Sequence, residues 1–312
     1  MQAKISPKEA GQRLDIWLAV RFHDKSRHWL KKEIQAGRVL INKKEAKPSK
    51  KLKENDTVEV NLKEPLPFKL EANQKIKIKT VYEDENFVVI DKQPGISVHP
   101  AAPPRNDTLV NGLLAEYPEI KNVGDRPEIR PGIVHRLDKD TSGLMVVARN
   151  QKAFDLLKGQ FQKRQVEKRY LALVSGHPKK NSGVIENFIG RSLSSPTKQT
   201  VVGKKASFKQ NFLKRIAKTA FEVKKRLGGY TLIECRPKTG RMHQIRVHLK
   251  FVGLPIVGDQ KYGLKKEKLG KKLKRQFLHA QSLSFYDLEN HKISLESPLP
   301  KDLRKILKIL EK

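Results

Sequence analysis

The sequence predicts an α+β protein in which a mixed, mostly antiparallel sheet domain follows a small domain of helices and β-turns. Strand-like segments far outnumber β-α-β units after residue 76. The first 64 residues carry a pattern of their own, and the proline-containing segment EPLPFK separates the two parts. With 312 residues, the chain can form one large core and a smaller one. We therefore expect domains at residues 1–64 and 76–312, joined by a linker at residues 65–75.

The small N-terminal domain is expected to contain two helices followed by two strands. Apolar residues recur with a helical period in LDIWLAVR. Ser26 stands where the N-cap of a second helix belongs, and Gly37 stands at its end. The segments RVLIN and DTVEV alternate like strands, with Lys43 and Lys44 in the turn that follows the first strand.

The larger domain is expected to be rich in strands and covered by a few helices. Apolar spacing over residues 302–310 predicts a C-terminal helix that docks on the sheet. The expected strands lie in IKIKTVY, NFVVIDK, GLMVVAR, YLALVSG and YTLIEC, and the other expected helices lie in LVNGLLAEY and KAFDLLKGQFQK.

The charge of the chain points to a polyanionic partner. Lys and Arg number 66 against 33 Asp and Glu, a formal net charge of +33. No apolar run approaches membrane-spanning length and the N-terminal segment lacks the apolar core of a signal peptide, so we expect nucleic acid rather than a membrane. The single Cys235 excludes an internal disulfide and favours a cytoplasmic protein.

The densest group of charged residues is HRLDKDTSGL, residues 135–144, which runs into the apolar segment MVVA. One interpretation is a solvated loop whose charges cancel, which such segments usually are. The other is a catalytic carboxylate, Asp138 or Asp140, that neighbouring groups keep ionised. Thr141, Ser142 and Gly143 provide turn residues that lead into the strand.

A second candidate segment is RPKTGRMHQIRVHL, residues 236–249. We expect a helix capped at Thr239, with Ile245, Leu249 and Val252 on its apolar side and Gly253 at its end. Two histidines five positions apart on a helix converge poorly, so no zinc site is expected.

The arginines of this second segment invite different interpretations. An exposed basic face that touches phosphate accounts for Arg241. Arg246 has apolar neighbours in the sequence, and a buried guanidinium needs a carboxylate partner, for which Asp138 is the best candidate. Such a pair serves equally in catalysis and in a structural ion pair, and spacing alone does not separate the two.

The N-terminal segments resemble the small RNA-binding domain first seen in ribosomal small-subunit protein S-four. The resemblance covers QRLDIWLA, SRHWLKKEIQAGRVLIN and KLKENDTVEV, about residues 12–61. In that family the two helices and the following β-turn form a basic surface for structured RNA. The resemblance therefore implies RNA contacts at Arg13, Ser26, Arg27, Lys31, Lys32 and Arg38.

The larger domain resembles the RluA-type pseudouridine synthases. The motifs VVIDKQPGISVHP, PGIVHRLDKDTSGLMVVARN, KRYLALV, TGRMHQIRVHL, LPIVGDQKYG and RQFLHAQSLSF occur in that family's order between about residues 80 and 300. The resemblance implies isomerisation of uridine to pseudouridine in RNA, with no cofactor and no metal. It assigns the essential aspartate to Asp138, its arginine partner to Arg246 and the base-stacking tyrosine to Tyr170. Tyr170 can also be an ordinary core residue.

Further RNA contacts are expected around this site, at His135, Arg136, Arg241 and His243. Asp140 is expected to order the loop, because a second nearby carboxylate would raise the pKa of the first. The basic run at residues 261–275 is either an RNA-backbone contact or a solvated loop. Residues 206–227 and the segment YDLENH fit the family weakly.

The expected substrate is structured RNA of the large ribosomal subunit, and the expected protein is a monomer. Transfer RNA is the alternative substrate. Two other classes of function are kept open: a non-catalytic RNA-binding or ribosome-assembly protein, and a metal-dependent RNA hydrolase with Asp138 and Asp140 as ligands. The complete motif set argues against the first, and the lack of a wider carboxylate cluster argues against the second.

Overall fold

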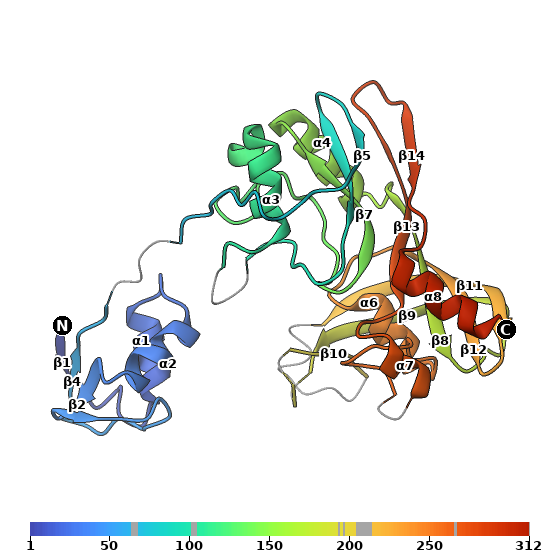
Figure 1. The fold of residues 1–312 in the computed structure, drawn as a ribbon. Coiled ribbons are helices and arrows are strands. Elements are labelled where there is room, and N and C mark those ends of the chain that lie inside the picture. Colours follow the sequence, from blue (N-terminus) through green and yellow to red (C-terminus); the bar gives the residue numbers. More distant parts are fainter. Residues whose placement is uncertain are drawn as a thin grey trace. The chain divides into compact units, whose positions relative to one another are not determined.

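The computed structural model describes residues 1–63, 68–100, 105–192, 194–195, 197–203, 214–264 and 267–311. The chain divides into two compact units, Met1–Phe68 and Lys69–Lys312 (Figure 1). The expected linker at residues 65–75 spans this division, and its residues 65–67 lie outside the described residues.

Unit 1 packs two helices against a four-stranded sheet of order β1-β4-β2-β3, in which every pairing is antiparallel. Its core contains Trp17, Leu18, Leu30 and Val58. The expected N-cap is confirmed, because the Ser26 hydroxyl accepts a hydrogen bond from the backbone N–H of Trp29. The elements are β1 (Gln2–Lys4), α1 (Leu14–Arg21), α2 (Arg27–Gln35), β2 (Val39–Ile41), β3 (Lys44–Glu45) and β4 (Thr57–Val60).

The turn after β2 differs from the prediction by one residue. Asn42 and Lys43 are its two residues with positive φ, at 50° and 64°, whereas Lys44 already belongs to β3. A two-residue hairpin turn requires positive φ at its centre, and Asn tolerates that conformation better than most residues.

Unit 2 contains a ten-stranded sheet of order β10-β9-β11-β12-β8-β13-β7-β6-β5, with β14 paired to β13. Among the described strands only β7 and β13 pair in parallel, which confirms the mixed, mostly antiparallel class. The strands are β5 (Thr80–Glu83), β6 (Phe87–Lys92), β7 (Ser142–Ala148), β8 (Glu167–Ser175), β9 (Ser182–Arg191), β10 (Gln199–Val201), β11 (Arg215–Leu227), β12 (Tyr230–Pro237), β13 (Leu278–Tyr286) and β14 (Lys292–Glu296).

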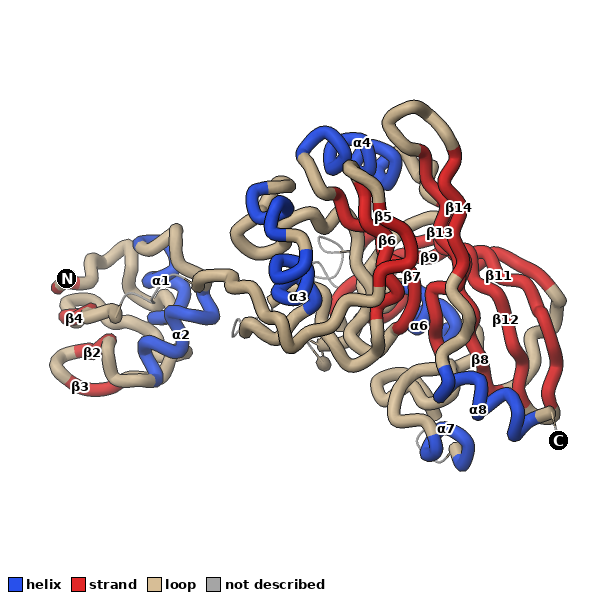
Figure 2. Tube along the Cα trace, turned by 45° about the horizontal axis from the view of Figure 1, so that its top comes forward, coloured by secondary structure: helices blue, strands red, loops and turns tan. Residues whose placement is uncertain are grey.

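The helices of unit 2 cover this sheet, and Figure 2 shows α3 and α4 beside β5, β6 and β7. The expected docking helix is confirmed, since α8 buries Leu303 and Ile306 in the main core. No helix among the described residues is long and apolar enough to span a membrane. The helices are α3 (Leu109–Glu116), the 3₁₀ helix η1 (Pro118–Asn122), α4 (Gln151–Gln162), α6 (Gln244–Phe251), α7 (Lys268–Lys272) and α8 (Lys301–Leu310).

Several strands are not evident from the sequence. β11 is the longest described strand, yet its sequence RIAKTAFEVKKRL has a lysine-rich end and no clean alternation. Its order comes from pairing with β9 on one side and β12 on the other. The expected strand at residues 76–82 is shorter than predicted, because β5 begins at Thr80.

Candidate active site

A cavity of about 360 Å³ lies in unit 2. Its lining comes mainly from three stretches: the loop before β7, the segment from the end of α4 into β8, and the segment from the end of β12 into α6. The first stretch contains HRLDKDTSGL and the third contains TGRMHQIR, so the fold brings the two candidate segments of the sequence to one site.

The loop that carries Asp138 leads into β7, which is buried along its whole length, as predicted. β7 pairs in parallel with β13, where Gly143 stands opposite Ala280. Gly143 has φ of +116°, and any side chain there would collide with the Ala280 carbonyl oxygen. Glycine is therefore required where the loop enters the sheet.

Lys92, the last residue of β6, holds this loop in place through hydrogen bonds. Its side chain is 1% exposed, and its ammonium donates hydrogen bonds of 2.9, 2.9 and 3.0 Å to the carbonyl oxygens of Gln93, Lys139 and Thr141. Burial lowers the pKa of Lys92 to about 7. Sequence reasoning assigned no role to this lysine, although it lies in the motif VVIDKQPG.

A second set of contacts holds the loop from the C-terminal part of the chain. Arg275 pairs with Asp302 and donates a hydrogen bond of 3.2 Å to the carbonyl oxygen of Asp140. The side chain of Gln276 donates one of 3.0 Å to the hydroxyl of Thr141. Asp140 thus helps to order the loop through its backbone. The basic run at residues 261–275 is not simply solvated, because Arg275 is buried within it; residues 265 and 266 lie outside the described residues.

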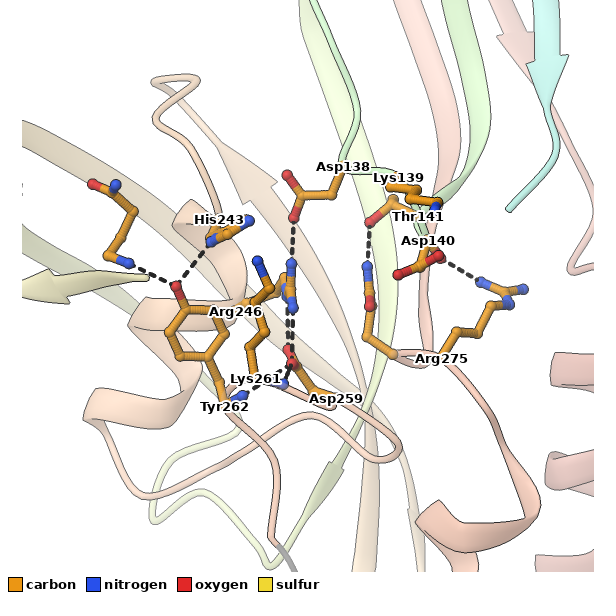
Figure 3. Close-up of polar contacts among 12 residues, drawn as sticks. Asp138, Lys139, Asp140, Thr141, His243, Arg246, Asp259, Lys261, Tyr262 and Arg275 are labelled. Atoms are coloured by element: carbon orange, nitrogen blue, oxygen red, sulfur yellow. Dashed lines mark hydrogen bonds and ion pairs between the residues drawn. The ribbon is translucent and has the colours of Figure 1, made fainter. Parts of the chain in front are cut away.

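The guanidinium of Arg246 lies between two carboxylates (Figure 3). Its Nη1 donates a hydrogen bond of 2.9 Å to Oδ2 of Asp138, while Nε and Nη2 donate bonds of 2.7 and 2.8 Å to the two oxygens of Asp259. The side chains are 17% exposed at Asp138, 6% at Arg246 and 0% at Asp259. The expected contact between Asp138 and Arg246 is present, and its buried anchor Asp259 was missed.

The charges within this group support one another. Burial by itself would lower the pKa of Arg246, but Asp259 and Asp138 raise it above its ordinary value. Burial by itself would raise the pKa of Asp259, but Arg246 and the backbone N–H groups of Lys261 and Tyr262 lower it. Arg246 therefore stays cationic and faces Asp138 with a positive charge.

The helix that presents Arg246 begins later than predicted. α6 starts at Gln244 rather than after a cap at Thr239, and its N-cap His243 has a left-handed φ of 56°. The Thr239 hydroxyl instead accepts a hydrogen bond from the backbone N–H of Lys218 in β11. Val252, expected on the apolar side, is 41% exposed. Contacts to the sheet override the local capping signal.

His243 and Arg246 share Tyr262 as a neighbour. The Tyr262 hydroxyl lies 2.8 Å from Nδ1 of His243 and accepts a hydrogen bond of 2.8 Å from the backbone N–H of Gln199. The Arg246 guanidinium lies 5.1 Å from the centre of the Tyr262 ring. Tyr262, in the motif GDQKYG, thus supports two residues that line the cavity.

Tyr170 lies on β8, where it lines the cavity and also belongs to the main core. This position is compatible with base stacking and with a core role. Burial, followed by the charge of Asp138, raises the pKa of its hydroxyl. That hydroxyl therefore stays protonated at neutral pH. Within the described part of the chain, it makes no hydrogen bond.

The two basic residues before Asp138 have different surroundings. His135 accepts a hydrogen bond of 3.1 Å at Nε2 from the backbone N–H of Val146, and its ring stacks on Phe161 at 4.7 Å. Burial lowers the pKa of His135 to about 3, so the ring is neutral. Arg136 is exposed at the cavity. Arg241 also lines the cavity, and its Nε donates to the carbonyl oxygen of Ile216. The RNA contacts of these residues and of His243 remain predictions.

In unit 1, three of the expected RNA contacts converge on Asp15, whose side chain is fully buried. Arg13, Arg27 and Lys31 approach it to 3.0, 2.8 and 3.4 Å, while their own side chains are 41%, 47% and 40% exposed. Burial alone would raise the pKa of Asp15, but the three cations lower it to about 2. One carboxylate thus gathers three exposed cations, an arrangement that the sequence did not reveal.

The other expected contacts of unit 1 are separate. Lys32 is exposed on α2, and the Ser26 hydroxyl serves as the helix cap. Arg38 forms a two-point pair with Glu33.

The metal-dependent alternative placed ligands at Asp138 and Asp140, and the structure shows these two residues in contact with Arg246 and Arg275. In the described residues, the grouping of potential metal ligands is Asp287, Glu289 and His291, two of them exposed, in the turn between β13 and β14. Asp138 is instead engaged by Arg246.

Comparison with protein-family models gives two matches. A model described as RNA pseudouridylate synthase matches residues 86–251, and one described as S4 domain matches residues 12–58. The two matched ranges fall in unit 2 and unit 1 respectively.

Full-length relatives agree with these matches. An uncharacterized RNA pseudouridine synthase of Bacillus subtilis is 36% identical over 310 residues, covering 98% of this chain and 97% of that protein. Ribosomal large subunit pseudouridine synthase D of Neisseria meningitidis serogroup A is 38% identical over 313 residues, covering 96% and 79%. The structure of human RNA pseudouridylate synthase domain containing 4 superposes with a TM-score of 0.60 at 28% identity, covering 75% and 93%.

Proposed function

The chain belongs to the RNA pseudouridylate synthase family, and from this premise we propose that it isomerises uridine in large-subunit ribosomal RNA with Asp138 as the catalytic group. One observation carries the residue assignment. Among the described residues that line the cavity, Asp138 is the single carboxylate, and a buried arginine holds it.

The reaction suits a site of this kind. The N1–C1′ bond of the uridine breaks, a C5–C1′ bond forms, C5 loses its proton and N1 gains one. Reactant and product are isomers, so no oxidant, reductant or cofactor is required. A carboxylate can serve in each of three routes: attack on the ribose, addition to the base, or elimination to a glycal-like intermediate.

Tyr170 is the proposed partner of the target base. Its ring can stack on the uracil, and its protonated hydroxyl can take part in the proton transfer at C5. The base must leave any stack to reach the cavity, which costs a few kcal/mol and is least costly in loops and mismatches. Backbone contacts elsewhere on the protein offset this cost.

Ribosomal RNA is favoured as the substrate by three observations. The chain carries a net charge of +33, an S4 domain precedes the catalytic domain, and relatives along nearly the whole chain are named as large-subunit enzymes. The Asp15 cluster of exposed cations suits contact with phosphates.

The test is a map of pseudouridines in RNA from cells with and without the gene. The proposal predicts loss of at least one site in large-subunit ribosomal RNA, restored by the wild-type gene and not by an Asp138→Asn gene. Loss confined to transfer RNA would replace the substrate. No lost site at all would favour a non-catalytic RNA-binding protein.

A further inference from the structure

The cavity beside Asp138 carries far more positive than negative charge. Seven Lys and Arg side chains line it against the one carboxylate of Asp138. Arg246 is neutralised by Asp138 and Asp259. In the described part of the chain, none of the other six cations forms an ion pair; they are Arg130, Arg136, Arg164, Lys168, Lys238 and Arg241.

Four of these cations come from two segments of the chain that both border the cavity. Arg164 lies in the connection between α4 and β8, Lys168 is the second residue of β8, and Lys238 and Arg241 follow β12. Their charges act on one another: burial and then Lys238 lower the pKa of Lys168 to about 8, and burial, Arg215 and Arg164 lower the pKa of Arg241. Such crowding of like charges is unfavourable in the protein alone.

Lys168 is the most informative of the four. It is two residues before Tyr170 on β8, so both side chains lie on the face of the strand that borders the cavity. Its ammonium lies 5.3 Å from the centre of the Phe161 ring. Lys168 is half-buried, and a partly desolvated cation without a carboxylate partner is unfavourable, which points to an anionic ligand.

Arg164 gives an independent indication. It follows the C-terminus of α4 with a left-handed φ of 61°. Glycine is the usual residue at this position, because a Cβ makes the left-handed conformation unfavourable. An arginine at this position makes the fold less stable than a glycine would, but it places a guanidinium at the cavity. Uncommon backbone conformations of this kind cluster at ligand sites.

We propose that Arg164, Lys168, Lys238 and Arg241 form a subsite for a backbone phosphate of the RNA next to the target uridine. The subsite rests on the proposed RNA substrate. Guanidinium groups bind phosphate oxygens in a fixed two-point geometry and ammonium groups add point charges. A nucleotide that turns into the cavity brings its flanking phosphate to the same opening, where the four cations replace its water and counter-ions.

The test measures binding of a labelled large-subunit ribosomal RNA transcript over a range of salt concentrations. Lys168→Met and Arg164→Gly should each weaken binding several-fold and reduce the slope of log affinity against log salt by about 0.7, the value for one lost contact with a single strand. Arg169→Gln is the matched control, because it removes one charge from the opposite face of β8 and should keep the wild-type slope.

Two further readouts separate the subsite from folding and from free phosphate. Both variants should unfold at the same temperature as the wild type or higher, since Lys168→Met removes a half-buried charge that lacks a carboxylate partner and Arg164→Gly removes a strained backbone conformation. Inorganic phosphate should displace the transcript from the wild type more strongly than chloride at equal ionic strength, and this difference should vanish in Lys168→Met.

The outcomes separate the subsite from the proposed function. Unchanged salt slopes in both variants, or an equal loss in Arg169→Gln, would overturn the subsite. Absence of any transcript binding by the wild type would instead overturn the proposed RNA substrate.

Discussion

Nη1 of Arg246 donates a hydrogen bond of 2.9 Å to Oδ2 of Asp138, although the two residues are 108 positions apart in the chain. The other two guanidinium contacts go to Asp259, which has no exposed side-chain surface. Asp259 therefore fixes the position of Arg246 independently of Asp138. The carboxylate proposed as catalytic is oriented by a residue that is itself held in place, a common arrangement where a small misplacement is costly.

Replacing Asp259 tests this arrangement. Asp259 accepts hydrogen bonds from Nε and Nη2 of Arg246 and from the backbone N–H groups of Lys261 and Tyr262. In Asp259→Asn, an amide NH₂ would face at least one of these donors. We expect kcat to fall about 10²-fold and the free energy of unfolding to fall by about 3 kcal/mol.

Denaturant unfolding and single-turnover kinetics measure the two effects, the kinetics at a temperature where the variant is folded. Asp125→Asn, which removes the exposed pair with Lys158, is the control and should cost less than about 1 kcal/mol. A folded Asp259→Asn protein with wild-type kcat would show that the anchor does not position Asp138.

Tyr170→Phe separates proton transfer from packing. The hydroxyl makes no hydrogen bond within the described residues, so its removal should change the free energy of unfolding by less than about 1 kcal/mol. If the hydroxyl moves the C5 proton, kcat should fall by about 10² to 10⁴-fold. A variant with wild-type kcat would restrict Tyr170 to stacking and packing.

Buried histidines should make the protein sensitive to acid. The folded-state pKa of His135 is about 3, against an ordinary value of 6.5. Between these pH values the unfolded chain binds a proton at His135 that the folded chain does not bind. The contribution of neutral His135 to stability is therefore fully present above pH 6.5 and is lost as the pH falls toward 3. Burial, as the largest cause, also lowers the pKa values of His99 and His248 to about 4, so these two residues act in the same direction.

Unfolding free energies from pH 7.5 to 4 test this expectation. His135→Gln keeps an acceptor for the Val146 N–H but does not titrate, so its curve should be shallower by about 1.4 kcal/mol per pH unit in the acid range. His28→Gln makes the same replacement at an exposed histidine and is the control for the loss of an imidazole ring as such. Parallel curves for wild type and His135→Gln would contradict the assignment.

In unit 1, Arg27→Gln should weaken RNA binding without unfolding the domain. Asp15 keeps Arg13 and Lys31 as partners, while one exposed cation is lost. The salt slope of transcript binding should decrease by about 0.7. Lys53→Gln, which removes an exposed cation elsewhere in the same unit, is the control. An equal decrease of the salt slope in both variants would mean that only the total charge of the unit matters.

The sequence predicts those parts of the fold that depend on neighbours along the chain. α2 forms where its cap and glycine stop indicate, because Ser26 bonds a backbone group three residues away. α6 does not follow its local signal, because Thr239 bonds Lys218 on another strand. β11 likewise depends on pairing across the sheet, which periodicity within the segment does not report.

The same distinction applies to the site. Asp138 and Arg246 could be paired from sequence because a buried arginine requires a carboxylate. The roles of Asp259 and Lys92 were not predicted. Asp259 contacts Arg246, 13 positions away in the chain, and Lys92 contacts Thr141, 49 positions away. Both lie in motifs with ordinary composition, and only the fold shows which backbone and side-chain groups they hold.

The most direct measurement uses an RNA transcript that carries tritium at C5 of uridine. C5 loses its hydrogen when it bonds to C1′, so each pseudouridine formed releases one tritium into water. The wild-type protein should release tritium from a large-subunit ribosomal RNA transcript, and folded Asp138→Asn protein should release it at least about 10²-fold more slowly. Release by Asp138→Asn at the wild-type rate would contradict the assignment of Asp138 as the catalytic group.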